Sequence, residues 1–157
     1  MNKGIHTTFV LSLVLSLVYF GVSNAEAEEL PTEYTVEMWN TDPDDRSRRM
    51  VFSEELITVA EGATVEFLAT DRGHNVEIVS GPDGVELPSK SRMNKDFEYT
   101  FAESGVYVYV CSPHATMGMI GVVVVGEPTT EQIEAAAGTK LRGPSKKKLA
   151  ELLEQIQ

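Results

Sequence analysis

The stretch VYVYVCSPHATMGMIGVVVV (residues 106–125) contains two runs of strand-forming residues joined by a loop of different character. Valine, isoleucine and tyrosine favour β-strands. The second run, IGVVVV (residues 120–125), is apolar throughout and predicts a strand buried on both faces. The loop, residues 111–119, holds the only cysteine of the chain, one histidine and two methionines. The stretch therefore predicts two strands, the second of them buried, that carry a cluster of soft metal-binding donors between them.

Five further segments have the residue types or the alternation of strands, with turn residues between them. They are residues 33–39, 56–59, 64–69, 75–79 and 97–101. Many short strands at close spacing are typical of a β-sandwich. We therefore predict a mainly β fold in which residues 26–126 form one sandwich.

The tail predicts two short α-helices. Thr129 followed by Gln132 forms a capping-box pattern, and the first helix is expected to end at Gly138. Ser145 is expected to cap the second helix, in which Leu and Ile residues form one apolar stripe. We expect this extension, residues 127–157, to pack on an end of the sandwich as part of the same domain.

The N-terminal segment has the features of an export signal. An apolar run (residues 9–21) precedes small residues at the spacing that signal peptidase reads. The run is shorter than a membrane span needs, although an uncleaved anchor is an alternative. Cleavage of residues 1–25 would place the mature protein in the periplasm. The formal net charge of −11 argues against partners that are nucleic acids or anionic membranes.

Beyond residue 25 the chain has one cysteine, Cys111, and two histidines, His74 and His114. An unpaired thiol is a liability in an oxidising compartment unless something occupies it. His74 lies between two predicted strands, and a sandwich can bring its loop beside residues 111–119. Two imidazoles, one thiolate and a weak thioether are the donors of blue copper sites. Because protein groups fill every position, such a site favours electron transfer over catalysis at the metal.

The motifs GVYVYVCSPHATMGM (residues 105–119) and TDRGHNVE (residues 70–77) resemble those of the cupredoxins, the type 1 blue copper proteins, and among them the pseudoazurins. The resemblance covers residue 34 to the C-terminus and implies a Greek-key β-sandwich with two short C-terminal helices.

The spacing alone admits either methionine of the loop as axial ligand. In amicyanins the ligand lies six residues after the cysteine, which would select Met117; in plastocyanins and pseudoazurins it lies eight after, which selects Met119. The helical tail favours the pseudoazurin type. The resemblance thus implies one copper ion per chain, cycling between Cu(I) and Cu(II) and held by His74, Cys111, His114 and Met119.

The resemblance also implies roles for residues around these ligands. Asn75 matches an asparagine that ties the two ligand loops together, and Pro113 lacks an N–H that could donate to the thiolate. His114 would be the electron port. An apolar patch ringed by bases would surround it, formed here by Met50, Pro113, Ala115, Met117, Arg72, Lys90, Arg92 and Lys95. The alternative is that these bases are scattered solvent-facing charges.

The expected function is electron transport without enzymatic activity. By resemblance the partners would be periplasmic redox proteins, such as a dehydrogenase, a cytochrome or the copper nitrite reductase of denitrification, and the contacts with them would be transient. The protein itself is expected to be a monomer without stable membrane association. The main alternative is a copper carrier or buffer. A copper enzyme would need a second, all-histidine site, for which no histidines remain beyond residue 25. The cysteine would also suit a cysteine hydrolase, a zinc site or a buried structural position.

Overall fold

The structure is a computed structural model that describes residue 1 and residues 29–156. The predicted signal peptide, residues 1–25, therefore lies outside the described residues apart from Met1. Within the described part of the chain, no helix has both the length and the apolar character needed to cross a membrane.

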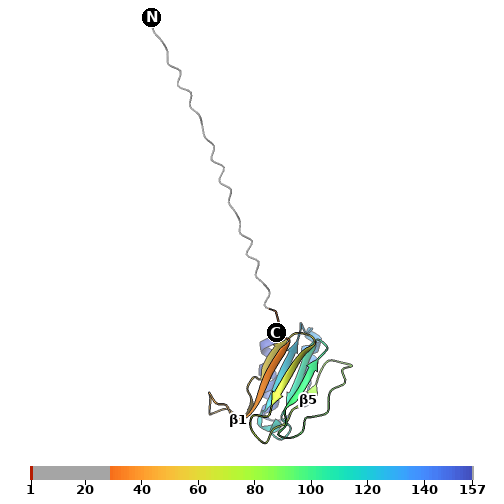
Figure 1. Ribbon diagram of the computed structural model, residues 1–157. Helices are drawn as coiled ribbons and strands as arrows, with labels where there is room; N and C mark the ends of the chain where they lie inside the picture. The colour runs from red at the N-terminus through yellow and green to blue at the C-terminus, as the bar shows by residue number, and fades with distance from the viewer. Residues whose placement is uncertain (2–28, 157) are drawn as a thin grey trace.

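Eight strands form two four-stranded sheets that face each other, as Figure 1 shows. The strands are β1 (Glu33–Thr41), β2 (Arg49–Phe52), β3 (Leu56–Val59), β4 (Ala63–Leu68), β5 (Glu77–Ser80), β6 (Phe97–Phe101), β7 (Gly105–Val110) and β8 (Ile120–Val125). The first sheet has the order β2-β1-β4-β6 and the second the order β3-β8-β7-β5. The predicted mainly β sandwich is confirmed.

Strands β7 and β8 pair without a break from Gly105 opposite Val125 to Val110 opposite Ile120. Both strands are buried at every position, which for β8 confirms the prediction made from its apolar run. The loop of residues 111–119 therefore leaves a regular antiparallel pair at a fixed point at one end of the sandwich.

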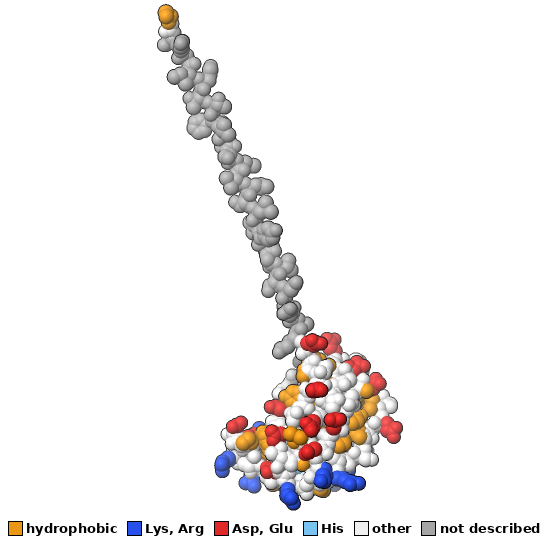
Figure 2. All heavy atoms as spheres, viewed as in Figure 1, with side chains coloured by type: hydrophobic (Ala, Val, Ile, Leu, Met, Phe, Trp, Pro, Cys, Tyr) orange, Lys and Arg blue, Asp and Glu red, His pale blue; other side chains and the backbone are white. Residues whose placement is uncertain are grey.

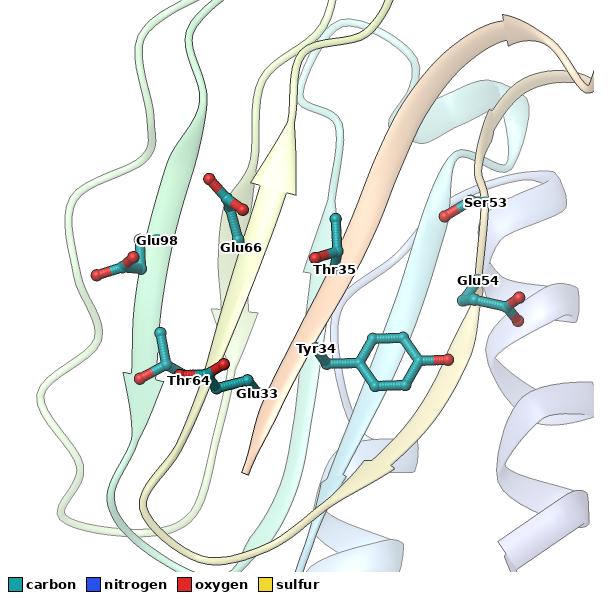
Figure 3. Close-up of a pocket in the computed structure, with 8 residues that line it drawn as sticks. All are labelled: Glu33, Tyr34, Thr35, Ser53, Glu54, Thr64, Glu66 and Glu98. Carbon is teal, nitrogen blue, oxygen red and sulfur yellow. The ribbon is translucent and has the colours of Figure 1, made fainter. Parts of the chain in front are cut away.

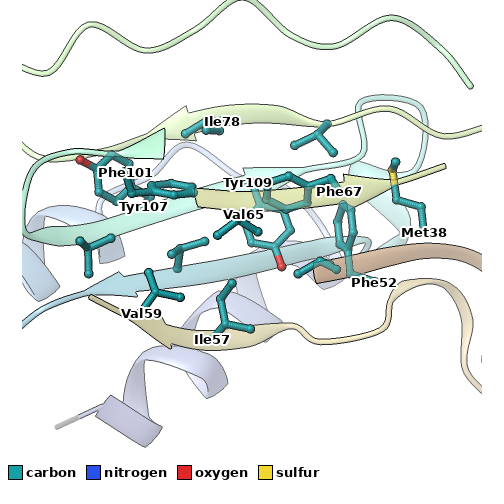
Figure 4. Close-up of a cluster of buried hydrophobic side chains, with 14 of the residues drawn as sticks. Met38, Phe52, Ile57, Val59, Val65, Phe67, Ile78, Phe101, Tyr107 and Tyr109 are labelled. Carbon is teal, nitrogen blue, oxygen red and sulfur yellow. The ribbon is translucent and has the colours of Figure 1, made fainter. Parts of the chain in front are cut away.

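The core between the sheets contains a group of edge-to-face aromatic rings (Figure 4). The ring centroids of Phe52 and Phe67 lie 4.8 Å and 5.0 Å from that of Tyr109. Such contacts add to the stabilisation gained by burying the rings. Cys111 continues the inward-facing side of β7 after Tyr107 and Tyr109, so the thiol is buried at the end of this core.

Two α-helices, α1 (Thr130–Ala137) and α2 (Pro144–Leu153), cover the outer face of the second sheet. Their apolar side chains pack on the outward-facing residues of β7 and β8, including Val108 and Val122. The expectation that the helices would pack on an end of the sandwich is wrong. Valines on both sides of these strands require a cover on the second face as well.

The two helices differ in how they begin. Thr129 and Gln132 form the predicted capping box of α1. Ser145, however, is not the cap of α2: the helix begins at Pro144 after Gly143, whose φ is 58°. Proline is well suited to the first helical position. Ser145 is instead buried inside the helix, and its hydroxyl donates a hydrogen bond to the Ala115 carbonyl.

Two strand boundaries depart from the alternating pattern. Strand β2 was not predicted because Met50 has a positive φ of 52° and because Val51 and Phe52 are both buried, which removes the period of two. Strand β5 begins at Glu77 rather than at Asn75. Residue 75 belongs instead to the loop that contacts residues 111–119.

The buried Tyr107 predicts that the free energy of unfolding falls at alkaline pH. Its hydroxyl donates to the Glu103 carbonyl, and burial, with the charges of Tyr99 and Glu103, raises its pKa from 10.0 to about 12. Between these two values the unfolded tyrosine ionises while the folded one stays neutral, so stability is lost as pH rises through this window. Burial raises the pKa of Tyr109 as well.

Urea unfolding of the copper-free protein at about pH 9 and about pH 11.5 measures this loss. We expect Tyr107→Phe to show a smaller drop in midpoint than the unsubstituted protein, because Tyr109 and Tyr34, whose pKa values burial also raises, still contribute. An equal drop in both proteins would contradict the assignment.

Candidate metal centre

Three donor side chains from two separate loops meet at one end of the sandwich. His74 lies in the loop between β4 and β5, Cys111 follows β7, and His114 precedes a single 3-10 turn, η1 (Ala115–Met117). One ligand atom of each residue lies within 4.8 Å of the others. Within residues 29–156, these three side chains lie close enough together to bind one metal ion.

The two imidazoles present the same ring nitrogen to the thiol. The Nδ1 atoms of His74 and His114 each lie 3.5 Å from Sγ of Cys111. Nε2 of His74 points away and donates to Oδ1 of Asn40 at 3.0 Å, which leaves Nδ1 unprotonated in the neutral ring. Fixing the outer nitrogen in this way orients an imidazole for metal binding.

Asn40 is a site residue that the sequence analysis missed. It lies near the end of β1, where its backbone N–H donates to the Asp71 carboxylate at 2.7 Å, and Asp71 N–H donates back to the Met38 carbonyl at 3.0 Å. These bonds hold the His74 loop against β1. Nothing in the pattern of residues 33–41 distinguishes Asn40, so only the fold reveals its role.

Burial controls the protonation of the histidines. It lowers the pKa of His74, an effect that the nearby His114 ring strengthens and the Asp71 carboxylate opposes. Burial also lowers the pKa of His114. Both rings therefore favour the neutral form, which is the form that binds a metal ion.

Burial acts in the opposite sense on the cysteine and raises the pKa of the Cys111 thiol. Hydrogen bonds from the backbone N–H groups of Asn75 and His114 work against that rise because they favour the thiolate. The group is thus a thiol without metal, and a bound cation would displace its proton. Pro113 has no N–H and supplies none of these bonds.

Asn75 joins the two loops. Its Oδ1 accepts the N–H of Ser112 at 2.9 Å, and its Nδ2 donates to the Ser112 hydroxyl oxygen at 3.1 Å. The hydroxyl of Ser112 then donates to the Glu77 carboxylate at 2.6 Å. These bonds fix the backbone next to Cys111 relative to the loop that carries His74.

The two methionines of the loop lie in different environments. Met119 has no exposed surface and belongs to the same core cluster as Cys111, whereas 57% of Met117 is exposed. The Met119 carbonyl accepts the Cys111 N–H at 3.0 Å, and the Met119 N–H donates to the His114 carbonyl at 3.3 Å. Burial and backbone contacts make Met119 the candidate fourth donor and leave Met117 on the surface.

The residues proposed for docking lie around this end. Pro113 and Met117 are exposed, while His114, Ala115 and Met50 are half-buried. Met93, which the sequence analysis did not select, is a further exposed apolar side chain, at 46%. It lies in the segment of residues 88–96, which also carries three of the bases.

The basic segment packs beside the His74 loop. Asn94 N–H donates to the His74 carbonyl at 2.8 Å, and the Asn94 side chain accepts the Gly73 N–H at 2.5 Å. All four predicted bases are exposed: Arg72, Lys90, Arg92 and Lys95. Figure 2 shows Lys and Arg gathered at the end of the sandwich where β1 ends, with Asp and Glu over the rest of this view. Arg48 differs, because it pairs with Asp42 and Glu55.

A hollow of about 700 Å³ lies elsewhere, on the outer face of the first sheet (Figure 3). Thr35, Glu66 and Glu98 form a row across three neighbouring strands there. The hollow is open and acidic and contains none of the converging donors. We therefore place the functional centre at the buried donor cluster and not in this hollow.

Comparison with known proteins gives consistent matches. Residues 40–126, which include all four candidate donors, match the family described as copper binding proteins, plastocyanin/azurin family. The chain is 37% identical to the pseudoazurin of Methylorubrum extorquens over 127 residues, which covers 80% of this chain and 82% of that protein. It is 35% identical to the pseudoazurin of Paracoccus pantotrophus over 112 residues, 70% and 76% of the two chains. A pseudoazurin structure from Sinorhizobium meliloti superposes with a TM-score of 0.72 and 39% identity, over 80% and 96% of the chains.

The different burial of the methionines predicts opposite results for matched substitutions. Met119→Leu should change the ratio of the two thiolate-to-copper absorption bands and raise the reduction potential, because an axial thioether tunes both. Met117→Leu should leave both unchanged. Methionine and leucine have similar volumes, so each change should cost less than about 1.5 kcal/mol in stability of the copper-free protein. A change in spectrum with Met117→Leu alone would select the other methionine.

Proposed function

The chain belongs to the plastocyanin/azurin family of copper-binding proteins, and from this premise we propose that it is a type 1 blue copper electron carrier whose ion is held by His74, Cys111, His114 and Met119. The observation that carries the proposal is the convergence of both Nδ1 atoms on the buried Cys111 thiol. Two imidazoles, a thiol and a buried thioether match the donor set of blue copper sites.

The arrangement supports electron transfer and not catalysis at the metal. When bound, the copper ion supplies a one-electron couple between Cu(I) and Cu(II). Hydrogen bonds through Asn40 and Asn75 hold the donors in position. A rigid donor set that suits both oxidation states needs little movement when an electron arrives or leaves. His114, half-buried while His74 is fully buried, provides the route to the surface.

The surface around His114 supports transient docking of a protein with an acidic face. Exposed apolar side chains there include Met93 and Met117. The bases of residues 88–96 and Arg72 stand beside them on a chain with a net charge of −11. A local positive face on an acidic protein would orient an acidic partner toward His114.

We further propose that the protein acts as a monomer in the periplasm, with residues 1–25 removed, residues 26–126 as the copper domain and residues 127–157 as its helical extension. The signal-like N-terminus supports the location. The resemblance to pseudoazurins supports a periplasmic reductase as acceptor, such as the copper nitrite reductase of denitrification.

An absorption spectrum of the copper-loaded protein tests the function. We expect an intense blue or green Cu(II) form that bleaches on reduction and returns on oxidation through many cycles. A copper carrier or buffer, the second candidate, would instead bind copper without this strong thiolate band or would lose the ion on cycling. Either of those results would reject the electron carrier.

The basic docking face predicts how the oxidation rate depends on salt. If the reduced protein meets a small anionic oxidant such as hexacyanoferrate(III) at this face, the rate should fall as ionic strength rises. Lys95→Gln should weaken that dependence. Thr58→Glu changes the net charge by the same amount on an exposed residue of β3 and should leave the dependence unchanged. A rate that rises with salt would show that the acidic body, and not a basic face, governs the encounter.

A further inference from the structure

The start of α2 packs directly against the loop segment between His114 and Met119. Ser145 has no exposed surface, and its hydroxyl donates to the carbonyl of Ala115, which lies 30 residues earlier in the chain. The same carbonyl accepts the N–H of Gly118 at 3.3 Å, which closes the turn η1. One hydrogen bond from the helix therefore fixes the carbonyl on which this turn is built.

Packing around Ser145 supports the same contact. A methyl group added at Gly118 would lie 3.5 Å from Cβ of Pro144, and one added at Gly143 would lie 3.3 Å from the Thr116 carbonyl oxygen. These are close van der Waals distances. Little room is therefore left between residues 143–144 at the start of α2 and the loop segment at Thr116 and Gly118.

Charged side chains anchor the helix in this position. Nζ of Lys148 lies 2.6 Å from the Glu55 carboxylate, and Glu55 also lies 3.6 Å from the Arg48 guanidinium. Lys148 and Glu55 are 26% and 16% exposed at their side chains. The Lys148–Glu55 pair connects α2 to the turn between β2 and β3.

We propose that α2 acts as a brace, meaning that it restricts the movement of the loop of residues 111–119, and that Ser145 is a positioning residue for His114 and Met119. These two residues lie at the ends of the segment that the helix contacts. A rigid segment limits how far His114 and Met119 can move apart. Removal of the buried Ser145 hydroxyl leaves the Ala115 carbonyl with the Gly118 N–H alone, and this frees the turn. The inference rests on the proposed ligand roles of His114 and Met119.

The test compares Ser145→Ala with Leu153→Ala, which removes a buried side chain from the other end of the same helix. In the copper-free protein, Ser145→Ala should speed hydrogen exchange of the Met117, Gly118 and Met119 amides by about tenfold, the effect of losing one buried hydrogen bond. In the copper-loaded protein it should speed copper release to a chelator by about tenfold and change the ratio of the two thiolate-to-copper bands. Leu153→Ala should lower stability but leave the band ratio unchanged.

The proposal would be overturned if Ser145→Ala and Leu153→Ala had equal effects on amide exchange and on the band ratio, or if Ser145→Ala left amide exchange unchanged. If Ser145→Ala does not fold, Lys148→Ala decides: faster exchange at residues 117–119 supports the brace, and unchanged exchange overturns it. Because exchange is measured without copper, its result does not depend on whether the protein carries electrons.

Discussion

The structure depends on one constraint: a buried thiol, a buried imidazole and a half-buried imidazole must meet at the end of the core. A buried polar group without a partner costs about 1–3 kcal/mol, so each of these groups needs its own contacts. His74 has Asn40 as the partner of its outer nitrogen, and the backbone N–H groups of Asn75 and His114 face Cys111. The paired strands β7 and β8 supply the fixed point from which Cys111 projects. The contacts of these protein groups therefore place the three donors together at this end of the core.

Three sets of hydrogen bonds hold the loops that carry the donors in place. Asn75 and Ser112 lock the two loops to each other, and the Asp71 bonds hold the His74 loop on β1. The segment of residues 88–96 is hydrogen-bonded to that loop through Asn94. Helix α2 holds the remaining side through Ser145. The same segments carry the surface groups around His114, so the contacts that support the site also shape the surface that a partner meets.

The features that could be predicted from the sequence are those that a local pattern of residues encodes. Strong periodicity identified the sandwich, and donor chemistry singled out His74, Cys111 and His114, which the structure brings together. The sequence could not reveal Asn40 or Ser145, because each acts through one long-range hydrogen bond that has no signature in nearby residues. The choice of Ser145 as a helix cap failed because Pro144 sets the helix start, while burial recruits the serine for another contact. The strand at Met50 was missed because a positive φ breaks the alternation that marks strands.

The central claim is that the fold holds these donors ready for copper. Crystal structures of the copper-free and copper-loaded protein at the same pH test it most directly. We expect Nδ1 of His74 and of His114, Sγ of Cys111 and the Met119 thioether to surround the ion, and we expect none of these side chains to change rotamer between the two structures. A copper ion bound elsewhere, or a loop that must rearrange before Cys111 and both histidines reach the ion, would contradict it.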